Sequence, residues 1–119
     1  MEGNFNYTID GVERKFFFGN YALEQTLLEF NVSVSDIADI LDTKLLPFLR
    51  TFIFHAAAYP ILEQGNEPDF TPFGVHKWID ATGGPNGPFM LSAAKKIYKA
   101  LGVGESTTDA VPEKKSKKE

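Results

Sequence analysis

Polar and apolar residues alternate strictly at the start of the chain. The apolar positions of residues 4–9 are Phe5, Tyr7 and Ile9, which is the period of a strand with one buried face. Asp10-Gly11 follows and favours the positive φ angles of a type I′ turn. This turn predicts a hairpin to Phe18, with three pairs on one face: Ile9 with Val12, Tyr7 with Arg14, and Phe5 with Phe16. Phe17 is expected to point the other way.

Beyond Gly19 the apolar residues recur at the three- and four-residue spacing of helices. The pattern predicts helices over 21–30, 34–41, 46–61, 72–82 and 88–101. Asn20 is expected to cap the first helix, and Ser33 with Asp36 resembles a capping box for the second. Thr71-Pro72 is typical of a helix start, and Gly102 of a helix end.

The segment 46–61 is the most apolar of these helices. One buried stripe is expected on it, formed by Leu46, Leu49, Phe52, Ile53, Ala56 and Tyr59. Phe48 and Phe54 lie off that stripe, and Pro60 is expected to kink or end the helix. Residues 45–62 approach the length of a membrane span. Arg50, His55 and two prolines favour a core helix instead.

The order of elements predicts an α+β fold that is mainly α: an N-terminal β-hairpin followed by about five short helices. We expect one domain over residues 1–102 and a disordered, Lys-rich C-terminal tail over residues 103–119, which is polar and lacks periodicity. The chain has 119 residues, 43% of them hydrophobic, which suffices for one core. It has no cysteine, so disulfides and thiolate chemistry are excluded.

Charge is distributed unevenly. The whole chain carries a net charge of −4, yet its last seven residues hold four lysines and two glutamates, so the remainder is more acidic than the whole. An acidic body does not favour a nucleic-acid partner. The first ten residues, MEGNFNYTID, lack the basic start and apolar run of a secretory signal. Neither a nucleic-acid nor a membrane partner is therefore expected.

Candidate chemistry is sparse. His55 lies in the most apolar helix and is expected to be a hydrogen-bonded or snorkelling histidine. His76 and Asp80 are four residues apart, but two weak ligands do not make a metal site. The spacing of Asp36, Asp39 and Asp42 fits a cation site or, more simply, a solvated helix face. No phosphate loop, nucleophile elbow or metalloprotease motif is present. We therefore predict a protein that is not an enzyme, with no cofactor and no metal.

The chain has more large aromatic side chains than a hairpin and five short helices are expected to cover. Eleven residues are phenylalanine and one is tryptophan. Contiguous exposed apolar surface usually marks protein–protein contact. The candidate partner-binding residues are Phe48, Phe52, Phe54 and Trp78, for contact with another protein or for self-association. The alternative is that most of them form the core.

A resemblance gives these features a context. The opening FNYTIDGVERKFFFGNYALEQTLLEFNVSVSDIADIL, the apolar third helix and VHKWID resemble the short form of tail assembly chaperones from long-tailed bacteriophages. The resemblance covers about residues 4–101 and rests on the order of elements, because the family has no invariant motif.

The resemblance implies a transient role in the cytoplasm of a bacterial host. Such chaperones bind the tape measure protein, recruit tail tube subunits and are absent from the mature virion. Many are made in two lengths, the longer by ribosomal frameshifting, and adjacent lysine codons in the tail PEKKSKKE suit such a site. Two alternatives are a structural tail or head–tail component retained in the particle, and a small metal-dependent enzyme using His55 or His76.

Overall fold

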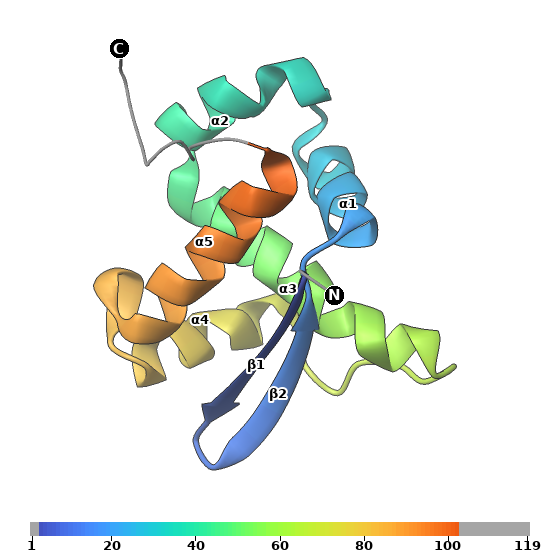
Figure 1. Cartoon of the computed structure of the whole chain (residues 1–119), viewed down its shortest axis with the longest axis vertical. Coiled ribbons are helices and arrows are strands. Elements are labelled where there is room, and N and C mark those ends of the chain that lie inside the picture. Colours follow the sequence, from blue (N-terminus) through green and yellow to red (C-terminus); the bar gives the residue numbers. More distant parts are fainter. Residues whose placement is uncertain (1–2, 103–119) are drawn as a thin grey trace.

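The structure, a computed structural model, describes residues 3–102 (Figure 1). The tail predicted for residues 103–119 lies outside the described residues. Within them the predicted fold class is confirmed: one hairpin is followed by five α-helices and two short 3₁₀ helices. In chain order the elements are β1 Asn4–Ile9, β2 Val12–Phe17, α1 Asn20–Phe30, η1 Val34–Asp36, α2 Ile37–Thr43, α3 Leu45–Glu63, α4 Pro72–Ala81, η2 Gly84–Asn86 and α5 Pro88–Leu101.

The hairpin has the predicted register. Ile9 pairs with Val12, and Phe5 pairs with Phe16. Asp10 has φ 52° and the following glycine φ 80°, the two positive angles that a type I′ turn requires. Glycine adopts such angles at little cost, and Asn and Asp do so more readily than other residues, so Asp10-Gly11 explains the turn and the pairing.

Both faces of the hairpin are covered by helices. The ring of Phe16 is buried and lies 5.6 Å, centroid to centroid, from Phe89 at the start of α5. The ring of Phe17 points to the opposite face and lies 5.0 Å from Tyr59 of α3. An isolated hairpin is marginally stable in water. Packing between α5 and α3 therefore holds this one in place.

Helix α3 runs through the middle of the fold and contacts α1, α2, α4, α5 and β2 (Figure 1). It is long and apolar enough to cross a membrane, but here the other elements pack around it. Of the two outcomes expected at Pro60, a kink or an end, the helix does not end there but continues to Glu63. The prediction of one buried stripe was wrong, because Phe48 is fully buried whereas Leu46 is half exposed. A helix enclosed on nearly every side has no single buried stripe.

The predicted helix starts are largely confirmed. The Asp36 carboxylate accepts a hydrogen bond from the Ser33 backbone N–H at 3.0 Å, as in a capping box. The Thr71 hydroxyl oxygen accepts one from the Gly74 N–H at 3.2 Å. The prediction for α1 was wrong by one residue, because Gly19 is the N-cap and Asn20 is the first helical residue.

Replacing Thr71 by alanine is expected to destabilise the protein by about 1 kcal/mol, because an N-terminal N–H of α4 loses its side-chain acceptor. Urea unfolding of the two proteins measures the difference. The matched control is Asn20→Ala, which removes a polar side chain at a helix start without removing a cap. It should change the free energy of unfolding by less than about 0.5 kcal/mol. Equal losses in both variants would contradict the assignment of the caps.

Helix α5 has the predicted bounds, Pro88–Leu101, and Gly102 has the expected positive φ of 74° after its last turn. The buried residues of this helix are Phe89, Met90, Ala93 and Ile97. Phe89 packs against the aromatic face of the hairpin, whose residues are distant from it in the sequence.

Candidate binding surfaces

The four aromatic residues predicted to contact a partner lie mainly inside the fold. Phe48 and Phe52 are fully buried, and Trp78 is 7% exposed. Phe54 is half-buried and packs against the core, with its ring 5.7 Å from that of Phe70. The guanidinium carbon of Arg14 lies 4.9 Å from the Trp78 ring centre and covers it. Burial therefore corrects the prediction: Phe48, Phe52 and Trp78 offer a partner almost no surface.

The structure places His55 as a hydrogen-bonded core histidine, as expected. Its Nε2 lies 2.5 Å from Oε2 of Glu29, which comes from α1. The two residues are 26 positions apart, so no spacing along one helix indicates the pair. Tyr21 lies edge-on to the imidazole, 6.1 Å between ring centres. The contact between His55 and Glu29 joins α3 to α1 and engages Nε2 of the histidine.

The described residues contain no group of three or more His, Asp or Glu side chains close enough to hold a metal ion. His76 is exposed on α4, with its ring 5.7 Å from that of Phe73. The Asp36 carboxylate is engaged in the cap described above, while Asp39 and Asp42 are exposed. This arrangement fits the solvated helix face that was one of the two interpretations.

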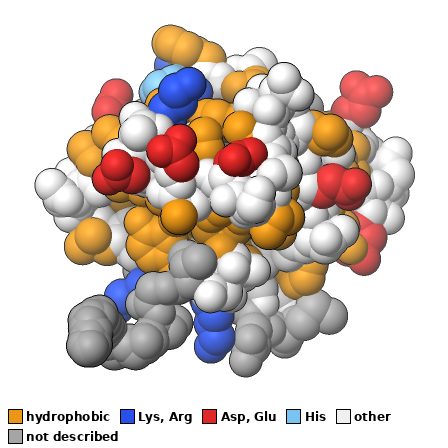
Figure 2. All heavy atoms as spheres, turned by 90° about the horizontal axis from the view of Figure 1, so that it is seen from above, with side chains coloured by type: hydrophobic (Ala, Val, Ile, Leu, Met, Phe, Trp, Pro, Cys, Tyr) orange, Lys and Arg blue, Asp and Glu red, His pale blue; other side chains and the backbone are white. Residues whose placement is uncertain are grey.

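A first apolar surface runs along α1 and the segment after it, and we call it the α1 groove. It is an open depression of about 290 Å³, lined by Asn20, Leu23, Glu24, Leu27, Leu28, Val32 and Val34. Leu28 is 67% exposed and Val34 65% exposed. Seen from the α2 end of the molecule, hydrophobic side chains lie at the surface with acidic side chains among them (Figure 2). This groove offers apolar contact on an acidic body.

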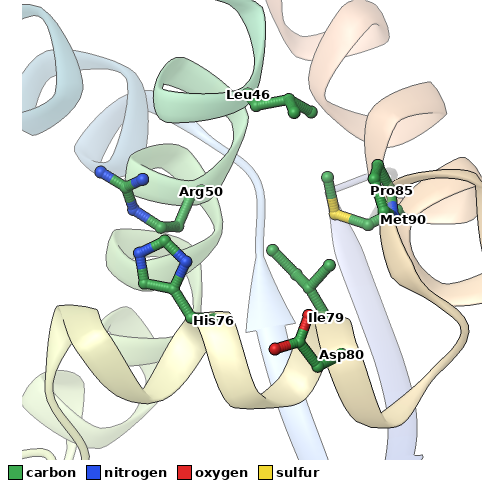
Figure 3. Close-up of a pocket in the computed structure, with 7 residues that line it drawn as sticks. All are labelled: Leu46, Arg50, His76, Ile79, Asp80, Pro85 and Met90. Carbon is green, nitrogen blue, oxygen red and sulfur yellow. The ribbon is translucent and has the colours of Figure 1, made fainter.

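A second surface lies where three helices meet, and we call it the α3–α4–α5 pocket. It has a volume of about 190 Å³ and is lined by Leu46, Arg50, His76, Ile79, Asp80, Pro85 and Met90. Figure 3 shows Arg50 and His76 on one side and Pro85 and Met90 on the other. The side chain of Ile79 points into the space between them. Four of the seven lining residues are apolar, and Arg50, His76 and Asp80 add a guanidinium, an imidazole and a carboxylate.

A third, shallower depression lies along α5. It is lined by Phe5, Ser92, Lys95, Lys96 and Lys99. Burial raises the pKa of the neighbouring Tyr98 above that of a free tyrosine, so its phenol stays neutral over the physiological range. The lining of this depression is basic, with three lysines and the hydroxyl group of Ser92.

Comparison with models of protein families found no match, and comparisons with curated proteins and with solved structures found none either.

Both apolar surfaces were missed by sequence reasoning. The α3–α4–α5 pocket combines residues from three segments, 46–50, 76–80 and 85–90, and no periodic pattern links them. A signal for exposure was nevertheless present. Leu28 only flanks the helical positions of Leu23, Leu27 and Phe30, and Phe73 does not share the spacing of Val75, Trp78 and Ile79. Large apolar residues outside the main apolar face of a helix are candidates for surface contact.

Proposed function

We propose that this protein is a tail assembly chaperone of a long-tailed bacteriophage. It binds the tape measure protein, recruits tail tube subunits during assembly in the host cytoplasm and leaves before the virion is complete. Two observations support the proposal: the resemblance over residues 4–101, and the exposed α1 groove on an acidic body. The groove is the observation that carries it, because a chaperone needs apolar surface that stays available on a folded protein.

The α1 groove fits an apolar face of a partner helix. Amphipathic helices bind in apolar grooves through side chains at three- and four-residue spacing. Burying a fully exposed leucine contributes about 1.5–3 kcal/mol, and Leu28 and Val34 are each about two-thirds exposed. Each should then contribute about 1–2 kcal/mol to binding. Tape measure proteins are long, helical and apolar, so they offer such faces.

Leu28→Ser and Val34→Ser are expected to weaken binding of the tape measure protein encoded in the same genome by about tenfold each. The reason is that each removes apolar contact area from the groove. Co-expression, affinity purification and titration with a tape measure fragment measure the effect. Both variants should keep the thermal stability of the parent, because both side chains are exposed.

The matched control is Leu91→Ser, which removes a leucine that is 53% exposed and does not line the α1 groove. It should leave binding unchanged. Equal binding by all three variants would exclude the groove as the contact. Recovery of the protein from purified virions by mass spectrometry would instead favour a structural tail or head–tail component.

A further inference from the structure

We propose that the α3–α4–α5 pocket receives the Phe73 ring of a second copy of this chain, so that the protein forms a two-fold symmetric dimer. The inference goes beyond the proposed function and does not depend on it. It rests on three features of the described residues: an exposed phenyl ring, a pocket of matching size, and two opposite charges. In a two-fold dimer each of these charges would face the opposite charge of the second copy.

Phe73 is an unusual exposed side chain. It lies in the first turn of α4 and is 67% exposed. His76, Lys77 and Asp80 are exposed on the same helix at spacings of three, four and seven residues, so the four side chains share one face. The Lys77 Nζ lies 6.0 Å from the ring centre of Phe73. This face of α4 therefore projects an aromatic ring, bordered by a cation, into solvent.

The size of the pocket suits one aromatic ring. Its volume of about 190 Å³ is below the range of about 300–1,000 Å³ that is usual for small-molecule sites. An apolar cavity of about 150 Å³ is known to accept benzene. The lining of Leu46, Ile79, Pro85 and Met90 is apolar, as a phenyl group requires.

Phe73 of the same molecule is not among the residues that line the pocket. Phe73 and Asp80 are seven residues apart on α4, about 10 Å along the helix axis. When two α4 helices cross antiparallel near Lys77, a two-fold rotation places Phe73 of one copy beside Asp80 of the other. Pro85 and Met90 border the pocket at that end (Figure 3). The second copy then supplies the ring.

The charges of the pocket support the same arrangement. Arg50 and Asp80 both line it, yet neither forms an ion pair or a side-chain hydrogen bond with another described residue. In a two-fold interface the same patch meets itself, so residue i of one copy faces residue j of the other. Arg50 on one side of the axis then faces Asp80 of the second copy, twice in each dimer.

Sedimentation equilibrium of the full chain over a concentration series tests the proposal. The parent protein is expected to show a reversible monomer–dimer equilibrium. Phe73→Ser should raise the dimer dissociation constant by about a hundredfold, because each dimer loses two buried rings. Leu91→Ser, an exposed leucine outside the pocket lining, is the control and should dimerise like the parent.

A charge exchange makes the test specific. Arg50→Glu and Asp80→Arg should each be monomeric alone, because each homodimer would bring like charges together twice. An equimolar mixture of the two should dimerise, because both pairs then join opposite charges. Circular dichroism checks that each variant is folded. A parent that stays monomeric, a Phe73→Ser protein that dimerises normally, or a mixture that stays monomeric would each overturn the proposal.

Discussion

Replacing Phe89 by alanine is expected to destabilise the protein by about 3–5 kcal/mol. The Phe89 side chain is fully buried and lies among the rings of the hairpin, 5.1 Å from Tyr7, 5.6 Å from Phe16 and 6.2 Å from Phe5 between centroids. Its removal leaves a cavity between α5 and the sheet that neither element can close alone. Domains of this kind are stable by about 5–15 kcal/mol, so the variant retains a small part of its stability.

Urea unfolding followed by circular dichroism measures this loss, and amide hydrogen exchange locates it. The hairpin amides should lose protection first, because the contact with α5 is what covers their aromatic face. Phe73→Ala is the matched control, since it deletes the same ring from an exposed site. In a dilute sample it should change stability by less than about 0.5 kcal/mol. A small effect of Phe89→Ala would contradict its place in the core.

Gly87→Ala is expected to be the second most damaging change, at about 3 kcal/mol. Gly87 caps α5 with φ −76°, an angle that alanine adopts readily, so backbone strain is not the cause. A Cβ at this position would meet the Thr82 carbonyl oxygen and would lie 2.8 Å from the Cα of Gly83. Both neighbours are backbone atoms and cannot rotate aside, so the link between α4 and α5 must shift.

Gly74→Ala provides the contrast. It lies in the first turn of α4, and the nearest atom to its added Cβ would be the Thr71 hydroxyl oxygen at 3.8 Å. Alanine should stabilise this helix by about 0.5–1 kcal/mol. Thermal unfolding of the two glycine variants should therefore shift the midpoint in opposite directions. A loss of stability in both would show that glycine is needed at Gly74 for another reason.

Local signals predicted the elements of this fold well. Asp10-Gly11 determines the hairpin register through the angles that only certain residues adopt. Thr71 marks a helix start through its hydroxyl group, and Gly102 marks a helix end through its positive φ. Each of these signals acts within a few residues, so it can be interpreted without knowledge of the rest of the chain.

Predictions that needed the tertiary fold were less accurate. The buried side of α3 could not be determined because apolar residues surround the helix, and Phe48 was placed off the stripe although it is fully buried. The helix was predicted to reach residue 61, with a kink or an end at Pro60, and α3 continues to Glu63. The candidate contacts were chosen by counting aromatic residues. A count of aromatic residues does not reveal that Arg14 covers Trp78. Side chains that are buried in the fold were therefore predicted to lie at the surface.

The aromatic contact between the hairpin and Phe89 also determines when the fold can be completed. Ribosomes add about 5–20 residues per second, so several seconds separate the appearance of Phe16 from that of Phe89. Trp78, whose ring lies 5.9 Å from that of Phe16, also follows late in synthesis. Until α5 is made, Phe5, Tyr7 and Phe16 lack the ring that packs against them in the complete fold. Products truncated before α5 lack this contact permanently.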